Sequence, residues 1–197
     1  MSTTETADQL GPARPRRADA QRNYDKVLTA AREAFADRGA STSLEEIARR
    51  AEVGIGTLYR HFPTRQALLE AVYVGEVEEL CSSAEDLNEL APWEALASWL
   101  HRVAQYLVVK QALAGELMSY VDRDAKVFKT CRGQLFAAGG PILERAQEAG
   151  VARSDTDFAE VIQLVGGIAK IPTAEPRQID HMIDMALDGL RYRAPDA

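Results

Sequence analysis

The sequence has little of what disulfide-linked, metal-binding or catalytic proteins need. Its two cysteines, Cys81 and Cys131, lie far apart without a CxxC spacing, so we expect two packed thiols. The three histidines, His61, His101 and His181, are also too scattered to share a metal. No glycine-rich phosphate loop is present, and no nucleophile or carboxylate pair has a recognisable catalytic partner. These absences argue against an enzyme and predict neither a metal nor another cofactor.

Long apolar runs are missing as well. No stretch is long enough to span a bilayer, and residues 1–17 lack the apolar segment of a signal peptide, so we expect a cytoplasmic protein. Runs of Val, Ile and Thr are scarce, whereas Ala and Leu predominate, which favours helices throughout. With 197 residues the chain can form a small head and a larger body. The sequence therefore predicts an all-α fold.

Charge is distributed unevenly along the chain. The net charge of −7 argues against a protein coated in basic surface. Residues 9–69 nevertheless hold 11 Lys and Arg against 7 Asp and Glu, whereas residues 71–197 hold 12 against 20. A mildly basic head on an acidic body leaves room for one localised phosphate-binding face.

The head is predicted to begin with a disordered arm. Residues 1–19 are polar, contain two prolines and show no periodicity. The arm is either a solvated tail or a segment that touches DNA through its arginines. After it, apolar residues recur at helical spacing from Tyr24 to Phe35, and Gly39 is placed to cap that helix.

Two short helices joined by a tight turn should follow. Thr42 with Glu45, or Ser43 with Glu46, forms a capping box, so a helix begins here whichever hydroxyl caps it. After a short break a second helix ends before Pro63. Such a pair suits a helix-turn-helix, in which the first helix braces a second one that enters the major groove of DNA. The periodicity alone also fits any small helical bundle.

A resemblance narrows this choice. The sequences SLEEIA at residues 43–48 and VGIGTLYRHFPTR at residues 53–65 closely resemble the N-terminal domain of the TetR family of bacterial transcriptional regulators. The likeness extends over residues 24–69. It implies a helix-turn-helix head, a homodimer, a variable ligand-binding body and, usually, repression. Glu52 departs from the family, which commonly has Gly in this turn, and a left-handed backbone at that position would cost Glu roughly 1 kcal/mol.

The resemblance also implies which residues meet double-stranded operator DNA. The positions of Tyr59, His61 and Arg65 contact the DNA backbone in the family, although Lys is commoner at the last. Thr57 and Ile55 stand where base edges or a thymine methyl are read. The predicted DNA-binding residues are Thr42, Ile55, Gly56, Thr57, Tyr59, Arg60, His61 and Arg65. Three of them also have plain structural interpretations, with Tyr59 in the head core, Thr57 as a cap and His61 as an ordinary surface residue.

The predicted division is an arm over residues 1–19, a DNA-binding domain over 20–64, and a helical ligand-binding and dimerisation domain over 65–197. In this last part, helices are expected from Thr64 onward and over residues 93–109, 111–121 and 123–138. A break or kink should follow at Gly139-Gly140-Pro141. A helix ending at Gly150, another capped by Ser154 or Asp155, and a last one after Pro172 complete the expected body.

The body offers candidate residues for an effector and for a partner chain. Apolar residues cover an unusually wide arc over residues 93–109, which favours a pocket for a small, mainly apolar molecule. The predicted ligand-binding residues are Trp99, Tyr106, Met118, Phe128 and Phe136. The predicted dimer interface comprises Val161, Leu164, Val165, Ile168, Met182, Met185 and Leu190. Either set could instead be ordinary core, and the regulator could respond to a protein partner rather than a small molecule.

Overall fold

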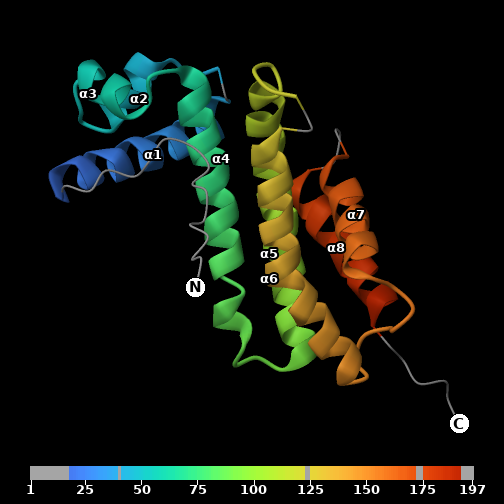
Figure 1. The fold of residues 1–197 in the computed structure, drawn as a ribbon. Coiled ribbons are helices and arrows are strands. Elements are labelled where there is room, and N and C mark those ends of the chain that lie inside the picture. The colour runs from blue at the N-terminus through green and yellow to red at the C-terminus, as the bar shows by residue number, and fades with distance from the viewer. Residues whose placement is uncertain (1–17, 40, 123–124, 172–174, 192–197) are drawn as a thin grey trace, which may run out of the picture. The chain divides into compact units, whose positions relative to one another are not determined.

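The computed structural model describes residues 18–39, 41–122, 125–171 and 175–191, and this part of the chain is helical (Figure 1). It contains eight α-helices, one 3-10 helix and no strand, so the predicted all-α fold is confirmed. No helix within it is long and apolar enough to cross a membrane. The elements are α1 (Ala18–Arg38), α2 (Leu44–Arg50), α3 (Ile55–His61), α4 (Arg65–Ser82), η1 (Glu85–Leu87), α5 (Pro92–Leu117), α6 (Lys126–Glu148), α7 (Phe158–Ala169) and α8 (Pro176–Leu190).

The described residues form two compact units. The first, called the head unit below, contains the described residues up to Gly75 together with those from Ala112 to Val127. The second, the body unit, contains residues 76–111 and the described residues from Phe128 onward. Helices α4 and α5 therefore each contribute residues to both units, and the predicted boundary at residue 64 falls inside the head unit.

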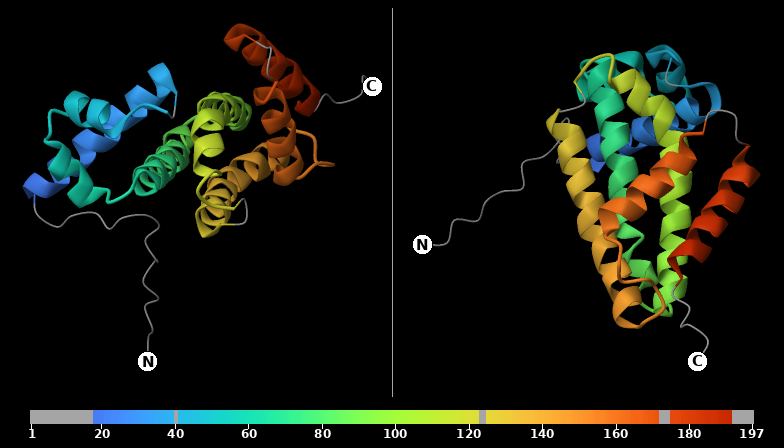
Figure 2. Two further views of the ribbon diagram at one scale, coloured as in Figure 1. Left: turned by 90° about the horizontal axis from the view of Figure 1, so that it is seen from above. Right: turned by 90° about the vertical axis from the view of Figure 1, so that its right-hand side faces the viewer.

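The first three helices pack against one another in the head unit (Figures 1 and 2). Their apolar faces are buried as the periodicity predicts, because α1 packs against both α2 and α3. Gly39 ends α1 with a φ of +78°, and its N–H donates to the carbonyl of Phe35 at 2.9 Å. Residues 1–17 of the predicted arm lie outside the described residues, whereas Ala18 and Asp19 already belong to α1. The arm prediction was therefore too long by those two residues.

In the body unit, α6 corrects one prediction. Of the break or kink expected at Gly139-Gly140-Pro141, the break is wrong, because α6 runs through all three residues and has Pro141 inside it. Gly139 is buried where α5 and α7 approach, and a Cβ there would lie under 3.0 Å from the rings of Trp99 and Phe158. Gly140 lacks the Cβ that disfavours helical backbone before a proline. The two glycines thus serve close packing and helix continuation rather than a break.

The connections of the body unit correct two more predictions. The helix expected over residues 111–121 is instead the end of α5, which continues to Leu117. Helix α7 is capped by Asp157, whose side chain accepts the N–H of Glu160 at 2.8 Å. Asp155, one of the expected caps, instead accepts hydrogen bonds from Arg153, whose Nε and Nη2 lie 2.5 and 2.7 Å from its two carboxylate oxygens.

The last helix is tied to the rest of the body unit. Helices α7 and α8 lie side by side (Figures 1 and 2). At the end of α8 the backbone N–H of Arg153 donates to the carbonyl of Leu190 at 2.9 Å, and Ala152 forms an isolated antiparallel bridge with Arg191. The Arg191 guanidinium lies 5.1 Å from the centre of the Trp93 ring. The carboxyl end of α8 is thus held by contacts with distant parts of the sequence.

Candidate nucleic-acid interface

Helix α3 has one side exposed to solvent and the opposite side packed into the head unit. Leu58 and the following Phe62 are completely buried, and the Phe62 ring packs 4.9 Å from the ring of Tyr24 on α1. On the opposite side, Ile55 is 39% exposed and Tyr59 is 44% exposed. An exposed isoleucine and tyrosine on a helix fixed by two buried anchors form a surface that can enter a groove.

The other predicted DNA-binding residues of α3 share this accessible side. Gly56 and Arg60 are exposed, and Thr57 and His61 are half-buried. Gly54, not Thr57, occupies the N-cap position, so the interpretation of Thr57 as a plain cap does not apply. The His61 ring lies edge-on to the Tyr24 ring, with 6.0 Å between the ring centroids. Tyr59 is exposed and is therefore not a residue of the head core.

The turn between α2 and α3 is strained at the expected residue. Glu52 has a φ of 55°, which makes it a non-glycine residue with left-handed backbone. Its N–H donates to the carbonyl of Arg49 at 3.2 Å, and the next N–H, of Val53, donates to Ala48 at 3.0 Å. These bonds close the end of α2 and turn the chain into α3, at a cost of roughly 1 kcal/mol for the side chain at Glu52.

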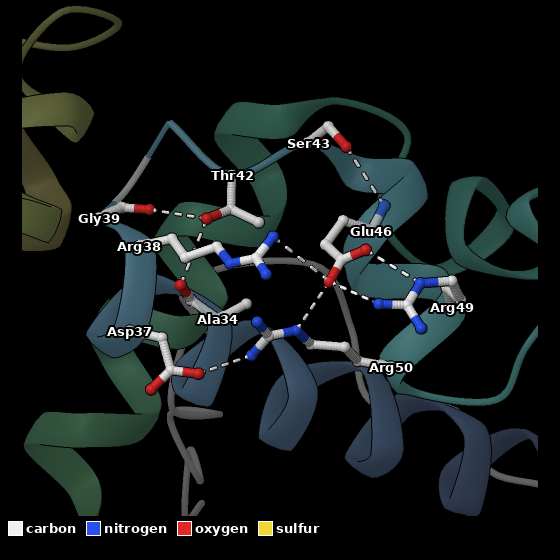
Figure 3. Close-up of polar contacts among 9 residues, drawn as sticks. All are labelled: Ala34, Asp37, Arg38, Gly39, Thr42, Ser43, Glu46, Arg49 and Arg50. Atoms are coloured by element: carbon white, nitrogen blue, oxygen red, sulfur yellow. Dashed lines mark hydrogen bonds and ion pairs between the residues drawn. The ribbon is translucent and has the colours of Figure 1, made fainter.

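The start of α2 separates two hydroxyls that the sequence left as alternatives. Ser43 is the N-cap, because its hydroxyl accepts the N–H of Glu46 at 3.2 Å (Figure 3). Thr42 is buried, and its hydroxyl lies 3.2 Å from the carbonyl oxygen of Ala34 and 3.0 Å from that of Gly39. Thr42 therefore fastens the start of α2 to the end of α1, and its side chain faces inward rather than toward solvent.

Glu46 has a role that its capping position did not reveal. Figure 3 shows its carboxylate among three guanidinium groups, those of Arg49 at 2.8 Å, Arg50 at 3.1 Å and Arg38 at 3.8 Å. Hydrogen bonds from Arg49 and then Arg50 lower the pKa of Glu46 to about 2. Arg50 also donates to Asp37 at 2.9 Å, so the network joins α2 to the end of α1. The Glu46 spacing to Arg49 and Arg50, three and four residues on, was the available signal.

Arg65 begins α4 and is held inside the head unit. Its Nη1 donates to the backbone carbonyl of Thr42 at 2.7 Å, and its Nε donates to the Glu116 carboxylate at 3.3 Å. The guanidinium carbon also lies 5.9 Å from the centre of the Phe35 ring. The predicted phosphate-contacting cation thus already has an anionic neighbour from the same chain.

Comparison with known proteins places this geometry in a family. Residues 27–72 match the family model of bacterial regulatory proteins of the tetR family, and residues 91–192 match the C-terminal domain of SbtR-like transcriptional regulators. The chain belongs to the TetR family. The predicted recognition is therefore confirmed, and this TetR-family protein is a DNA-binding transcriptional regulator, not an enzyme.

Individual relatives agree with the assignment. The regulator UidR of Escherichia coli K12 is 35% identical over 152 residues, which cover 75% of this chain and 78% of UidR. The regulator SAR0097 of Staphylococcus aureus is 32% identical over 103 residues, which cover half of this chain and 53% of the relative. Among solved structures, the TetR regulator SCO0520 of Streptomyces coelicolor is 39% identical with a TM-score of 0.75, over 87% of this chain and 99% of that one.

The body of this TetR-family protein brings some predicted ligand residues together. Trp99 is completely buried, its ring 5.8 Å from that of Phe158, and Phe136 lies edge-on to the same Phe158 ring at 5.2 Å. Phe158, the first residue of α7, is therefore the centre of the aromatic cluster. Within the described part of the chain, the Trp99 indole N–H is buried without a hydrogen-bond acceptor.

The remaining predicted ligand residues are more scattered. Tyr106 is buried on α5, and Phe128 is half-buried at the start of α6. Met118 belongs to the head unit and is exposed, so it does not join the aromatic cluster of the body unit. The body unit also has a groove of about 530 Å³ that includes none of the five; it is lined by Cys81, Ala84, Glu85, Asn88, Gln134, Ala137, Ala138, Pro141, Ile142 and Arg145.

The predicted dimer residues fall into two groups. Val161, Val165 and Leu190 are buried within their own unit, because they lie on the sides of α7 and α8 that face its core. Leu164 is 46% exposed and Met185 is 61% exposed. Ile168 and Met182 are half-buried. These last four residues, Leu164, Ile168, Met182 and Met185, are called the α7–α8 face below.

Proposed function

We propose that this regulator binds operator DNA as a homodimer, represses transcription, and leaves the operator when a small, mainly apolar molecule binds the body. The exposed side of α3 is the observation that carries the DNA part. It combines an apolar side chain, Ile55, with a hydroxyl, a phenol and a guanidinium, and two buried residues anchor the helix from behind. Such a mixed face can contact thymine methyls, base edges and phosphates together.

The proposed contacts divide into reading and positioning. Thr57, on the accessible side of α3, should read a base pair, whereas Arg65 should bind a phosphate and carry no sequence information. We expect Thr57→Ala to change preference at one or two base pairs. Arg65→Ala should weaken all duplexes similarly and reduce the salt slope by about one phosphate contact per head.

The test begins with a duplex selected by the wild-type chain from a randomised DNA library. Binding of both variants to that duplex and its single-base variants is then titrated at several salt concentrations. A sequence-selective defect in Arg65→Ala would contradict the division of roles. If the wild-type chain enriched no duplex, the proposed function itself would fail.

The α7–α8 face supports the homodimer. Leu164 and Met185 are large apolar side chains that stay exposed on two neighbouring helices, and a two-fold axis would cover them on both copies. Met185→Asp should therefore shift the chain toward monomer in sedimentation and weaken operator binding. Leu90→Asp is the matched control, since Leu90 is 38% exposed elsewhere in the body unit. Equal sedimentation of the two variants would contradict this interface.

The Trp99 cluster supports the effector. A buried donor without an acceptor costs about 1–3 kcal/mol. Because Trp99 is completely buried, a ligand must displace part of the packing around its ring, and an acceptor atom on that ligand would recover part of the cost. We therefore propose an effector with an apolar body and at least one acceptor oxygen or nitrogen. A coupling of about 1–3 kcal/mol would weaken operator binding about 5- to 150-fold, and the operator would weaken effector binding equally.

Native mass spectrometry of the purified chain, followed by operator titrations with each molecule found, tests the effector. Trp99→Phe should weaken effector binding because it removes the indole N–H, whereas the control Trp93→Phe should not. A molecule that bound both variants alike would place its site elsewhere, with the groove at Cys81 and Gln134 as the next location. A regulator that responded to no small molecule would favour control by a protein partner.

A further inference from the structure

Arg65 is surrounded by groups that bind a guanidinium. The N–H groups of an arginine bind carboxylates and phosphates with the same geometry, and its planar guanidinium stacks on aromatic rings. Here Glu116 is the anion, the Thr42 carbonyl is the backbone acceptor, and the Phe35 ring lies beneath the guanidinium. Each of these residues belongs to the head unit. The side chain of Arg65 is only 20% exposed in this arrangement.

The position of Arg65 at the start of a helix increases the stabilisation that an anionic neighbour provides. Arg65 is the first residue of α4, and the positive end of the helix macrodipole disfavours a cation there. Thr64 caps the helix, its hydroxyl accepting the N–H of Ala67 at 3.1 Å. A carboxylate or phosphate near this end compensates both the dipole and the guanidinium. Glu116 now fills that place, although it stands 51 residues later in the sequence.

We propose that Glu116 acts as an internal substitute for a DNA phosphate and holds Arg65 back from the operator. Binding to DNA then requires Arg65 to exchange the carboxylate for a phosphate oxygen. The loss of the internal ion pair therefore offsets part of the free energy gained from each new phosphate contact. Glu116 thereby sets operator affinity below the value that Arg65 alone would give. The proposal rests on the phosphate-binding role proposed above for Arg65.

The substitution Glu116→Gln tests this exchange because it removes the charge and keeps the size of the side chain. Since part-exposed ion pairs are weak, we expect the variant to bind the library-selected duplex about two- to fivefold more tightly per half-site. Asp122→Asn is the matched control. Asp122 is an exposed acid of the same unit, and the control corrects for the general gain from removing one negative charge near DNA.

A double-mutant cycle with Arg65→Gln separates the pair from long-range effects. The gain in duplex affinity from Glu116→Gln should disappear in a chain that also carries Arg65→Gln. Thermal unfolding should show Glu116→Gln to be equal or slightly lower in stability than the wild type, so tighter binding cannot reflect a better-folded head. The proposal is overturned if Glu116→Gln binds no more tightly than Asp122→Asn, or if its gain persists beside Arg65→Gln. If the wild-type chain selects no duplex, the proposed function fails first and this inference with it.

Discussion

Gly139 offers a sharp test of how the body unit is packed. Alanine at this position should gain about 1 kcal/mol from its higher helix propensity. Its Cβ would, however, overlap the rings of Trp99 and Phe158, of which the first is completely enclosed. Overpacking a well-filled core typically costs about 1–3 kcal/mol, and two blocked rings place this site toward the upper end. We expect Gly139→Ala to lower the free energy of unfolding by about 1–2 kcal/mol.

A matched substitution isolates the steric part. Gly133 lies on the same helix, and a Cβ there would meet nothing within 4 Å. Gly133→Ala should therefore raise stability by about 1 kcal/mol. The two variants should differ by about 2–3 kcal/mol, or about 4–12 °C in unfolding temperature for a chain of this size.

Urea unfolding at one fixed protein concentration, followed by tryptophan fluorescence, measures this difference. If Gly139→Ala proved as stable as Gly133→Ala, the close packing of α6 against Trp99 and Phe158 would be refuted. An unchanged fluorescence spectrum of the folded Gly139→Ala chain would count against it as well, because a displaced indole must change its surroundings.

Three further predictions concern the head unit. Glu52→Gly should raise stability by about 0.5–1 kcal/mol, because it relieves the left-handed strain but adds freedom to the unfolded chain; chemical unfolding that shows a loss would contradict the turn geometry. Glu52→Gln keeps the strain and removes a charge, so any gain in operator affinity shared by both variants is electrostatic rather than conformational. The pKa of Glu46 falls from 4.5 to about 2 on folding, so the contribution of Glu46 to the free energy of unfolding is complete above about pH 4.5 and is lost as the pH falls through 2. The urea midpoint of the wild type should therefore fall between these two pH values, and Glu46→Gln should make that fall smaller. An unaltered pH profile in the variant would refute the network.

The sequence predicted most where the signal was local. The caps and the apolar spacing of residues 43–62 predict two short helices, and the structure has both of them, α2 and α3. The strain at Glu52 was also foreseeable, since a left-handed turn residue is normally glycine. The family comparisons confirm the recognition that these residues allowed.

Long-range contacts explain what the sequence did not predict. In the sequence, Gly139 and Gly140 indicate a helix break. The structure shows instead that Gly139 lies against the rings of Trp99 and Phe158, which belong to other helices. The carboxylate of Asp155 was a reasonable cap, but Arg153 binds it, and Asp157 takes its place. The local sequence pattern does not predict that Glu116 pairs with Arg65. It also does not predict that Val161 and Val165 face the core of their own unit, since both features depend on tertiary packing.

The division of the chain into interleaved units affects how the protein is made. The head unit includes residues 112–127, so it lacks part of its structure when only its first 75 residues have been synthesised. At about 5–20 residues per second, the ribosome needs roughly 3–10 s more to deliver Glu116 after Arg65. Until then the Arg65 guanidinium on a nascent chain lacks its carboxylate partner. The body unit, in turn, is closed only when Arg191 has emerged to meet Trp93, so the head unit is the first of the two that can be completed during translation.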